Sequence, residues 1–276
     1  MLRAPTSWIL LMDPPAATLS SAEPLVAAAP ETLLALPAPL VTEPDTVHVW
    51  SFALEGPSEL VERCRVSLSA EERHRADRFV FARDRVRYTI AHAVLRTLLS
   101  RYCGEPPEAL RFSAAAAGKP ALQTSTREPP LHFNLTHSED RALLAVSDRR
   151  ELGVDLEHVR TNVDALAISR HYFFGSERAA IEAASSAERD TVFFRYWVAK
   201  EAVLKAQGIG LGFPLDRFRV DFLPGGEAAR IETFDPVALE PDWTVRMLPC
   251  ESGWLGAVAA RGTDWVVRLR TPRERL

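Results

Sequence analysis

Apolar and polar residues alternate with period two along many short segments of this chain, which predicts β-strands there. Up to the middle of the chain, we expect strands at 47–54, 110–113, 131–135, 143–146 and 152–157. Toward the C-terminus, we expect strands at 218–222, 229–233, 243–248, 255–260 and 265–270. The short turn at 147–150 predicts that the strands on either side of it, 143–146 and 152–157, pair as a hairpin.

Other segments carry the helical pattern, in which apolar residues recur every three or four positions. The sequence Ser69-Ala70-Glu71-Glu72 is a capping-box start and predicts a helix that runs to residue 81. A longer helix is predicted at 84–102, where Gly104 and the prolines after it end the pattern. Further helices are predicted at 163–172, 175–184 and 187–207.

An Arg-Asp pair, first at 83–84 and again at 189–190, opens each of the two long helices. In both places a short helix precedes the long one, and a turn and a strand follow it. This echo predicts an α+β fold of two similar halves, residues 46–150 and 151–276, related by a pseudo-twofold axis. A single chain with this internal symmetry is expected to be a monomer.

The first 45 residues differ from the rest, because prolines recur in them and basic residues are nearly absent. This composition predicts a flexible Ala/Pro-rich N-terminal leader over residues 1–45, with a short helix near 31–36. From residue 46 onward, the pattern of strands and helices described above begins.

Composition excludes several classes of function. The 276 residues carry a net charge of −4, which gives no reason to expect nucleic-acid binding. The three cysteines form no C-x-x-C pair, so zinc and redox motifs are unsupported and reduced thiols in a cytoplasmic protein are expected. No apolar run approaches the roughly 20 residues that span a bilayer, so no membrane association is expected.

Two carboxylates share one face of the predicted strand 152–157. Alternation puts Gly153, Asp155 and Glu157 on one side and three apolar residues on the other, with the acidic Cα atoms roughly 6–7 Å apart. Like charges this close repel unless water or a cation neutralises them, and hard oxygen ligands suit Mg²⁺. The alternative is an ordinary strand edge that faces solvent.

A third carboxylate lies on the apolar stripe of the predicted helix 187–207. Phe194 and Val198 continue at helical spacing to Glu201 and Lys205, so charged groups enter the face expected to be buried. A buried carboxylate without a partner is costly, so Glu201 should have a cation beside it. The alternative is that Glu201 and Lys205 form only an i,i+4 ion pair.

Two further segments carry groups able to hold an anion. Gly118-Lys119-Pro120 is a tight turn that presents a lysine, and Thr136-His137-Ser138 follows a predicted strand with hydrogen-bonding side chains. Either segment by itself is a common loop, and a lone histidine is more often structural or exposed than functional.

Taken in order, these segments resemble the Sfp-type phosphopantetheinyl transferase family. The resemblance spans roughly residues 69–215 and rests on the order and spacing of several modest motifs rather than on any one of them. The motifs are Arg78-Phe79-Val80-Phe81-Ala82-Arg83-Asp84, Gly118-Lys119-Pro120, Phe133-Asn134-Leu135-Thr136-His137-Ser138, Gly153-Val154-Asp155-Leu156-Glu157, Trp197-Val198-Ala199-Lys200-Glu201-Ala202-Val203-Leu204-Lys205 and Gly208-Ile209-Gly210-Leu211.

The resemblance implies an active site in the cleft between two α+β halves, with Mg²⁺ as cofactor (Mn²⁺ as a substitute) and coenzyme A as substrate. By similarity, the metal ligands would be Asp155, Glu157 and Glu201. Glu201 would also help to deprotonate the attacking serine, and Lys205 would contact the phosphates and favour departure of 3′,5′-ADP.

The remaining site residues are also implied by the resemblance. His137, with Thr136 beside it, would hold the 3′-phosphate of coenzyme A, and Lys119 and Arg75 would line the nucleotide site. One departure stands out: Glu72 occupies a helix position that is often basic in the family. It leaves open which of three nearby arginines, Arg73, Arg75 and Arg78, touches phosphate.

The implied partner is an apo acyl or peptidyl carrier protein, which would receive the 4′-phosphopantetheine arm on a serine. Two alternatives remain: another Mg²⁺-dependent nucleotide-processing enzyme, and a catalytically silent protein that only binds carriers. The presence of all three carboxylates and of Lys205 argues against the silent protein. The sequence leaves open which carrier is the acceptor: fatty-acid, polyketide and nonribosomal-peptide carriers all fit.

Overall fold

The computed structural model describes residues 23–37, 39–114, 118–123, 131–210, 212–234 and 239–272 of the chain. Its helices are α1 (Pro30–Leu34), α2 (Ser58–Ser67), α3 (Ala70–Asp77), α4 (Ala82–Cys103), α5 (Ala165–Tyr172), α6 (Gly175–Ala183) and α7 (Arg189–Gln207), with short 3₁₀ helices η1 (Pro107–Ala109) and η3 (Leu215–Arg217). Its strands are β1 (Thr46–Ala53), β2 (Arg111–Ala114), β3 (Pro120–Gln123), β4 (His132–Ser138), β5 (Arg141–Ser147), β6 (Leu152–His158), β7 (Phe218–Phe222), β8 (Ala228–Thr233), β9 (Trp243–Leu248), β10 (Trp254–Arg261) and β11 (Val266–Arg270).

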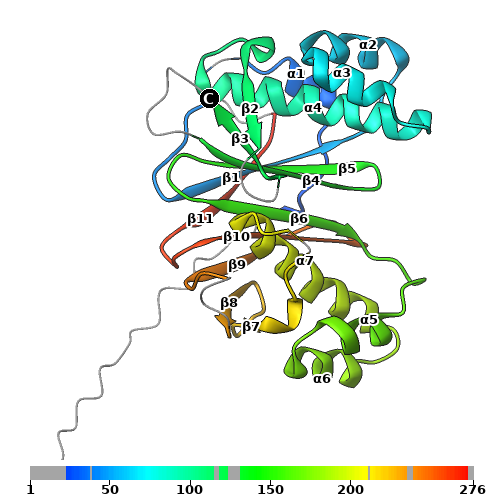
Figure 1. Ribbon diagram of the computed structural model, residues 1–276, viewed down its shortest axis with the longest axis vertical. Coiled ribbons are helices and arrows are strands. Elements are labelled where there is room, and N and C mark those ends of the chain that lie inside the picture. Colours follow the sequence, from blue (N-terminus) through cyan, green and yellow to red (C-terminus); the bar gives the residue numbers. More distant parts are fainter. Residues whose placement is uncertain are drawn as a thin grey trace, which may run out of the picture.

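Two β-sheets pack face to face, and a long helix covers the outer face of each (Figure 1). The first sheet has the strand order β11-β1-β5-β4 and packs against α4, while the second has the order β6-β10-β9-β8-β7 and packs against α7. Apolar side chains of both sheets, including Val49, Leu143, Val154 and Val258, fill the space between them. The expected α+β architecture, with a sheet and a long helix in each half, is confirmed.

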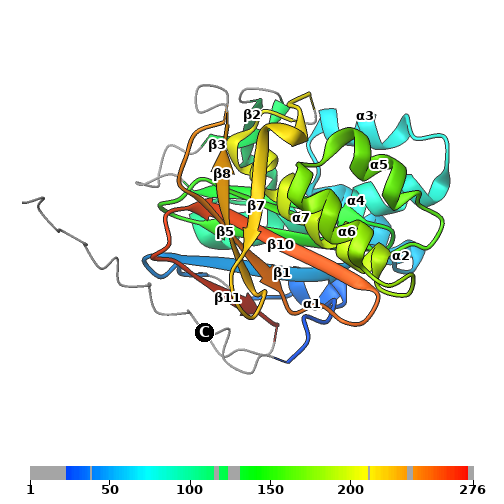
Figure 2. The same cartoon turned by 90° about the horizontal axis from the view of Figure 1, so that it is seen from below.

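The two long helices pack against the sheets of their own halves. α4 has 22 residues and α7 has 19, and each buries apolar side chains in the core of its own half. Figure 2 shows α5 and α6 beside α7 on the outer side of the second sheet. Within the described ranges, no helix combines the length and the apolar composition that spanning a bilayer requires.

The last strand returns to the first half. β11 pairs parallel with β1, with Thr46 opposite Val266 and Trp50 opposite Arg270. It follows β10, a strand of the second sheet, so the chain crosses between sheets near its C-terminal end. The first sheet is therefore completed by residues from the second half of the sequence.

The part of the predicted leader that the structure describes is packed against both halves. The Leu25 amide donates to the Pro249 carbonyl beside the second sheet (2.6 Å), and the Ala28 amide donates to the Ser51 carbonyl in the first (2.9 Å). Leu33, on α1, is fully buried in the core around α4. This segment thus belongs to the folded body, α1 confirms the short helix expected there, and the earlier leader residues lie outside the described chain.

Local sequence signals account for the ends of the main helices. The Ser69 hydroxyl accepts from the Glu72 amide (3.1 Å) and the Glu72 carboxylate accepts from the Ser69 amide (2.8 Å), so the predicted capping box forms at α3. α4 and α7 each end at a glycine in the left-handed region, Gly104 with φ 74° and Gly208 with φ 72°.

The hairpin expected between strands 143–146 and 152–157 is wrong. β5 pairs with β4 and β1 in the first sheet, whereas β6 pairs with β10 in the second. Both strands bury apolar faces between the sheets, so the turn at 147–150 carries the chain from one sheet to the other. The sequence patterns also missed α2 and β3, which are short elements stabilised by contacts with distant parts of the chain.

Candidate active site

The carboxylates of β6 face α7, as the alternation of the strand predicted. Leu152 and Val154 point into the core between the sheets, so Asp155 projects to the other side. Gly153 lies on that same side, and a Cβ atom there would overlap the backbone of Ala202 and Ala206 on α7. The glycine therefore allows the strand to lie directly against the helix that carries the third carboxylate.

A polar row on β4 joins the two halves at this point. The Asn134 side chain accepts from the Val154 amide (2.9 Å), and the Ser138 hydroxyl accepts from the His158 amide (3.3 Å). These side chains therefore satisfy backbone groups on the free edge of β6, as a neighbouring strand would do. Thr136 lies between them in the row and donates to Asp155 Oδ1 (3.2 Å).

Lys205 on α7 reaches into the same junction. Its Nζ lies 2.5 Å from Asp155 Oδ1 and 2.9 Å from Thr136 Oγ1, so it links α7 with both β6 and β4. Glu201, one turn earlier on α7, is buried, as its place on the apolar stripe predicted. The main partner of Lys205 is thus Asp155, from a different element, rather than its i,i+4 neighbour Glu201.

Two carboxylate oxygens at this junction are buried without a donor. Asp155 Oδ2 and Glu201 Oε1 have no hydrogen-bond partner among the residues that the structure describes. Burial raises the pKa of Asp155 to about 6 although Lys205 opposes the shift. Burial and the charge of Asp155 raise the pKa of Glu201 to about 7. Orphaned, mutually repelling oxygens of this kind fit a hard cation such as Mg²⁺.

The third expected ligand, Glu157, is engaged elsewhere. Its Oε2 accepts from Ser138 (2.9 Å) and pairs with Arg160 (3.3 Å). Across the described ranges, no group of three or more His, Cys, Asp or Glu side chains is gathered closely enough to hold a metal ion. The fit to a cation therefore rests on Asp155 and Glu201, and inclusion of Glu157 stays a prediction that requires its side chain to turn.

His137 lies on β4 next to Thr136, with its side chain on the exposed side of the strand. Partial desolvation and the positive charges of Lys205 and Arg87 lower its pKa. Arg87, on α4, lies 3.8 Å from Glu139, and its Nε has no partner among the described residues. The sequence does not single out Arg87, because the periodicity of α4 does not separate it from the other arginines nearby.

The departure at Glu72 has a structural explanation. Its carboxylate accepts from Arg96 (2.6 Å) and His92 (3.1 Å) on α4, in addition to its capping bond. Burial would raise the pKa of Glu72, but these hydrogen bonds lower it to about 2. Glu72 therefore fastens α3 to α4. Arg75, on the same helix, is exposed, with its guanidinium 5.6 Å from the centre of the Tyr88 ring.

Lys119 takes a position that the sequence did not suggest. Its ammonium donates to the Leu152 carbonyl at the start of β6 (2.9 Å) and to the Ala206 carbonyl at the end of α7 (2.6 Å). Burial lowers its pKa to about 8, while Glu151 opposes the shift. The lysine thus connects β3 with the two elements that carry Asp155 and Glu201.

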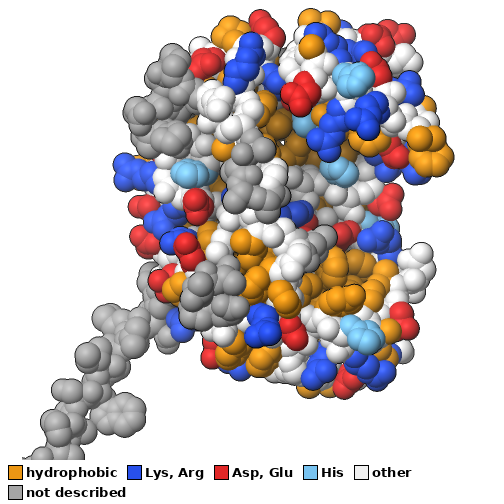
Figure 3. Space-filling view, in the orientation of Figure 1, with side chains coloured by type: hydrophobic (Ala, Val, Ile, Leu, Met, Phe, Trp, Pro, Cys, Tyr) orange, Lys and Arg blue, Asp and Glu red, His pale blue; other side chains and the backbone are white. Residues whose placement is uncertain are grey.

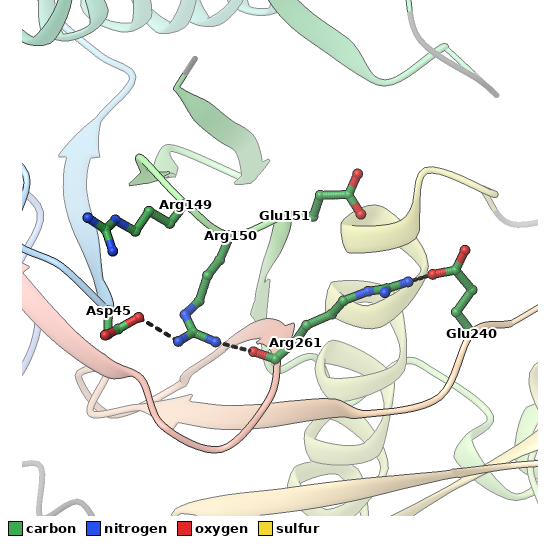
Figure 4. A pocket seen from close by; sticks show the side chains of 6 residues that line it. All are labelled: Asp45, Arg149, Arg150, Glu151, Glu240 and Arg261. Atoms are coloured by element: carbon green, nitrogen blue, oxygen red, sulfur yellow. Dashed lines mark hydrogen bonds and ion pairs between the residues drawn. The ribbon is translucent and has the colours of Figure 1, made fainter. Parts of the chain in front are cut away.

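A separate pocket of about 600 Å³ opens near the turn between β5 and β6. Figure 4 shows its lining, in which Arg150 binds Asp45 (2.6 Å) and the Arg261 carbonyl (2.8 Å), and the Arg261 guanidinium contacts Glu240. Acidic groups therefore already pair two of its arginines, and no group in it resembles the orphaned carboxylates described above.

Comparison with known proteins places the chain among transferases. The profile of the 4′-phosphopantetheinyl transferase superfamily matches residues 151–257, and the profile of the 4′-phosphopantetheinyl transferase N-terminal region matches residues 57–149. The 4′-phosphopantetheinyl transferase HetI of Nostoc sp. is 33% identical over 85% of this chain and 95% of its own length.

Two further relatives match a smaller part of this chain. The 4′-phosphopantetheinyl transferase Sfp of Bacillus subtilis is 30% identical over 61% of this chain and 72% of its own length. The human L-aminoadipate-semialdehyde dehydrogenase-phosphopantetheinyl transferase is 31% identical over 57% of this chain and 54% of its own length. The similarity thus extends across both halves of the described structure.

Proposed function

Because this chain belongs to the 4′-phosphopantetheinyl transferase superfamily, we propose that it transfers the 4′-phosphopantetheine moiety of coenzyme A to a serine of an apo acyl or peptidyl carrier protein. The proposed reaction requires Mg²⁺ and releases 3′,5′-ADP. The observation that carries this proposal is the pair of buried carboxylate oxygens without donors, Asp155 Oδ2 and Glu201 Oε1.

The metal would be held by Asp155 and Glu201, with Glu157 as third ligand after its side chain turns. When bound, Mg²⁺ would neutralise the charge of a pyrophosphate and stabilise the charge that develops during phosphoryl transfer. The raised pKa values of both buried acids are consistent with such a role, because a cation returns them to their charged forms.

Lys205 would bind and orient the pyrophosphate. An ammonium carries three protons, and the Lys205 contacts with Asp155 and Thr136 use two of them, which leaves one for a phosphate oxygen. His137 and Arg87 would hold the 3′-phosphate, with Arg75 and Lys119 as further predicted contacts of the nucleotide. Thr136, whose hydroxyl donates to Asp155, would have to exchange that bond in order to contact the phosphate as predicted.

Glu201 would accept the proton of the attacking serine, directly or through one water. The serine oxygen then forms a bond to the β-phosphorus of coenzyme A, and the bond from that phosphorus to the bridging oxygen breaks. The electron pair leaves with 3′,5′-ADP, whose developing charge Lys205 stabilises.

Intact-mass spectrometry tests the proposal. Apo carriers of the fatty-acid, polyketide and nonribosomal-peptide types are incubated with coenzyme A and the protein, with Mg²⁺, with Mn²⁺ or with EDTA. We expect at least one carrier to gain the mass of phosphopantetheine with the metal present, and its Ser→Ala variant to gain none. Coenzyme A hydrolysis without labelling, or carrier binding without product, would favour the two alternatives instead.

A further inference from the structure

The loop between α3 and α4 exposes two consecutive apolar side chains. Val80 has 87% of its surface in contact with solvent and Phe81 has 65%. Leaving large apolar groups in water forgoes the stabilisation that burial provides, and adjacent exposed groups of this kind are typical of interaction sites. The pair therefore requires an explanation that internal packing does not supply.

The loop is held in one shape by contacts on either side of this pair. Phe79 packs against Tyr88, with ring centres 5.4 Å apart, and its carbonyl accepts from Arg85 (3.4 Å). The Asp84 amide donates to the Phe81 carbonyl (3.1 Å) and so anchors the start of α4. Val80 and Phe81 are thus presented in a fixed arrangement, which lowers the entropy lost when a partner covers them.

Basic side chains surround the exposed pair. Four arginines in and beside the loop are exposed: Arg75, Arg78, Arg83 and Arg85. Of the acids nearby, Asp77 pairs with Arg65 on α2 (2.9 Å) and Asp84 pairs with Arg83 (3.4 Å). Figure 3 shows basic side chains beside apolar surface at the end of the upper half that carries α3 and the start of α4. The surface therefore favours a partner with acidic groups around an apolar centre.

The loop also lies at the edge of the candidate active site. Arg87, less than two turns after it on α4, lies 3.8 Å from Glu139, which directly follows the strand of Thr136 and His137. A protein seated on the loop would therefore lie next to the groups proposed to bind coenzyme A. That is the position a protein substrate needs in order to deliver a serine to the site.

We propose that the carrier protein docks on Val80 and Phe81 through an apolar patch bordered by acidic side chains, which face the arginines of the loop. This inference rests on the proposed function. A second copy of the chain is a poorer occupant, because a twofold contact through this surface would bring the same arginines of both copies together.

The test replaces the apolar pair and keeps the site. Val80→Ser/Phe81→Ser is compared with Val66→Ser, which changes a valine that is 76% exposed on α2. Position 81 is the N-cap of α4, where serine is favoured, so the double variant keeps the helix start. Steady-state kinetics with the best carrier and coenzyme A gives KM for each substrate separately.

We expect the double variant to raise KM for the carrier by roughly tenfold or more and to change KM for coenzyme A by less than about twofold, since it alters only one of two binding surfaces. Val66→Ser should match the wild type. An unchanged carrier KM in the double variant would overturn the docking site while wild-type transfer keeps the proposed function intact. Absence of transfer by the wild type to every carrier would instead overturn the function.

Charge and self-association complete the test. Arg83→Glu should also raise the carrier KM and weaken its dependence on salt, with KM for coenzyme A unchanged within about twofold, because one attraction to the carrier is replaced by repulsion. Sedimentation of the wild type and the double variant should show the same monomeric species. A wild-type dimer that the double variant dissolves, with the carrier KM unchanged, would assign the surface to a second copy and overturn the proposal.

Discussion

Two lysines on α7, five residues apart, each form an ion pair with a buried carboxylate. The two pairs differ in how completely their polar atoms are hydrogen-bonded. Lys200 is fully buried, and its ammonium contacts Glu177 Oε1 (3.0 Å) and the carbonyls of Leu215 and Phe218 (both 2.8 Å). The two oxygens of Glu177 in turn accept from backbone amides, one of them that of Val220 (2.8 Å). In this pair the ammonium has three acceptors, and both carboxylate oxygens have donors.

The second pair is incomplete. The side chain of Lys205 is 30% exposed and contacts Asp155 and Thr136, which leaves Asp155 Oδ2 without a donor in the described structure. Glu201, adjacent to Lys200 in sequence, adds a second such oxygen at the same place. Thr136 faces this pair from β4, whereas the side chain of its neighbour His137 is exposed.

The contrast distinguishes an ion pair whose polar atoms are all satisfied within the protein from one at the proposed metal site. Buried polar groups in native proteins are almost always satisfied, as Lys200 and Glu177 are, so the unsatisfied oxygens of Asp155 and Glu201 call for an external partner. The same helix thus contributes Lys200 to the core of the second half and Glu201 to the junction with the first half. We expect substitutions in the two pairs to have different consequences.

The largest effect is expected on catalysis at the incomplete pair. Asp155→Ala or Glu201→Ala should reduce transfer by roughly a thousandfold or more, since each removes a group expected at the metal and the pyrophosphate. Rates of carrier labelling measured by intact mass give the loss directly.

A measurement of stability shows whether the loss of transfer results from unfolding. Urea denaturation should show both variants folded, because Glu201→Ala removes an oxygen that has no donor, and Asp155→Ala leaves Lys205, whose side chain is 30% exposed, able to bind water instead. Near-normal labelling by either variant would remove that residue from the proposed site and would weaken the contrast with Lys200.

The next effect is expected on stability at the complete pair. Lys200→Met leaves the carboxylate of Glu177 buried without its cation and should lower the free energy of unfolding by about 3–5 kcal/mol. The double variant Lys200→Met/Glu177→Gln should recover part of this loss, since it removes the uncompensated charge while the side-chain oxygen can still accept from one of the two backbone amides. Urea denaturation measures both. A stable Lys200→Met protein would show that the pair contributes little.

The sequence predicted much of the incomplete pair because its signals are local. Alternation in β6 placed Asp155 opposite the apolar core, and the helical stripe of α7 placed Glu201 on a buried face. The complete pair was not predicted. α7 is buried around much of its circumference, so a single apolar stripe does not reveal a lysine on another face, and Glu177 comes from a different helix.

The contacts that the sequence did not predict are mainly those between distant segments. The role of Asn134 and Ser138 at the free edge of β6 depends on how two sheets meet, which no local periodicity encodes. The wrong hairpin between β5 and β6 has the same origin, because both strands have apolar faces and only the tertiary fold assigns them to different sheets. The pairing of β2 with β3, the strand that begins at Pro120, was likewise not predicted, because local periodicity does not encode it.

A smaller effect should appear in the stability of the metal-free protein. The folded-state pKa of Glu201, about 7, lies above that of a glutamate in an unfolded chain. Between these values the folded state holds a proton that the unfolded state has lost, so stability falls as pH rises from about 5 to about 8. Glu201→Gln removes this dependence and should be more stable than the wild type at about pH 8 by roughly 1–3 kcal/mol.

Urea denaturation in EDTA at both pH values checks this expectation. The advantage of Glu201→Gln should disappear near pH 5, where the wild-type carboxyl is protonated. Added Mg²⁺ should stabilise the wild type more than the variant. Equal stability of the two proteins at the higher pH would show that burial does not destabilise the charged form of Glu201. The two ion pairs would then differ less than their contacts indicate.

The smallest effect is expected at Lys119, which shares features with both Lys200 and Lys205. Like Lys200 it donates to backbone carbonyls, those of Leu152 and Ala206, yet these carbonyls belong to the elements that carry Asp155 and Glu201. A cation at the end of α7 also complements the helix dipole. Lys119→Met should therefore loosen the junction and lower kcat by about tenfold, which corresponds to about 1.4 kcal/mol of activation free energy.

The two Michaelis constants decide between this role and direct binding of the nucleotide. If Lys119 positions β6 against α7, KM for coenzyme A should change by less than about twofold while kcat falls, since the groups that bind the nucleotide stay in place. If its ammonium instead leaves the carbonyls to hold a phosphate, KM for coenzyme A should rise with kcat nearly unchanged. The second result would place Lys119 with Lys205 among the ligand-binding lysines, and the first would place it with Lys200 as a lysine that acts through the fold.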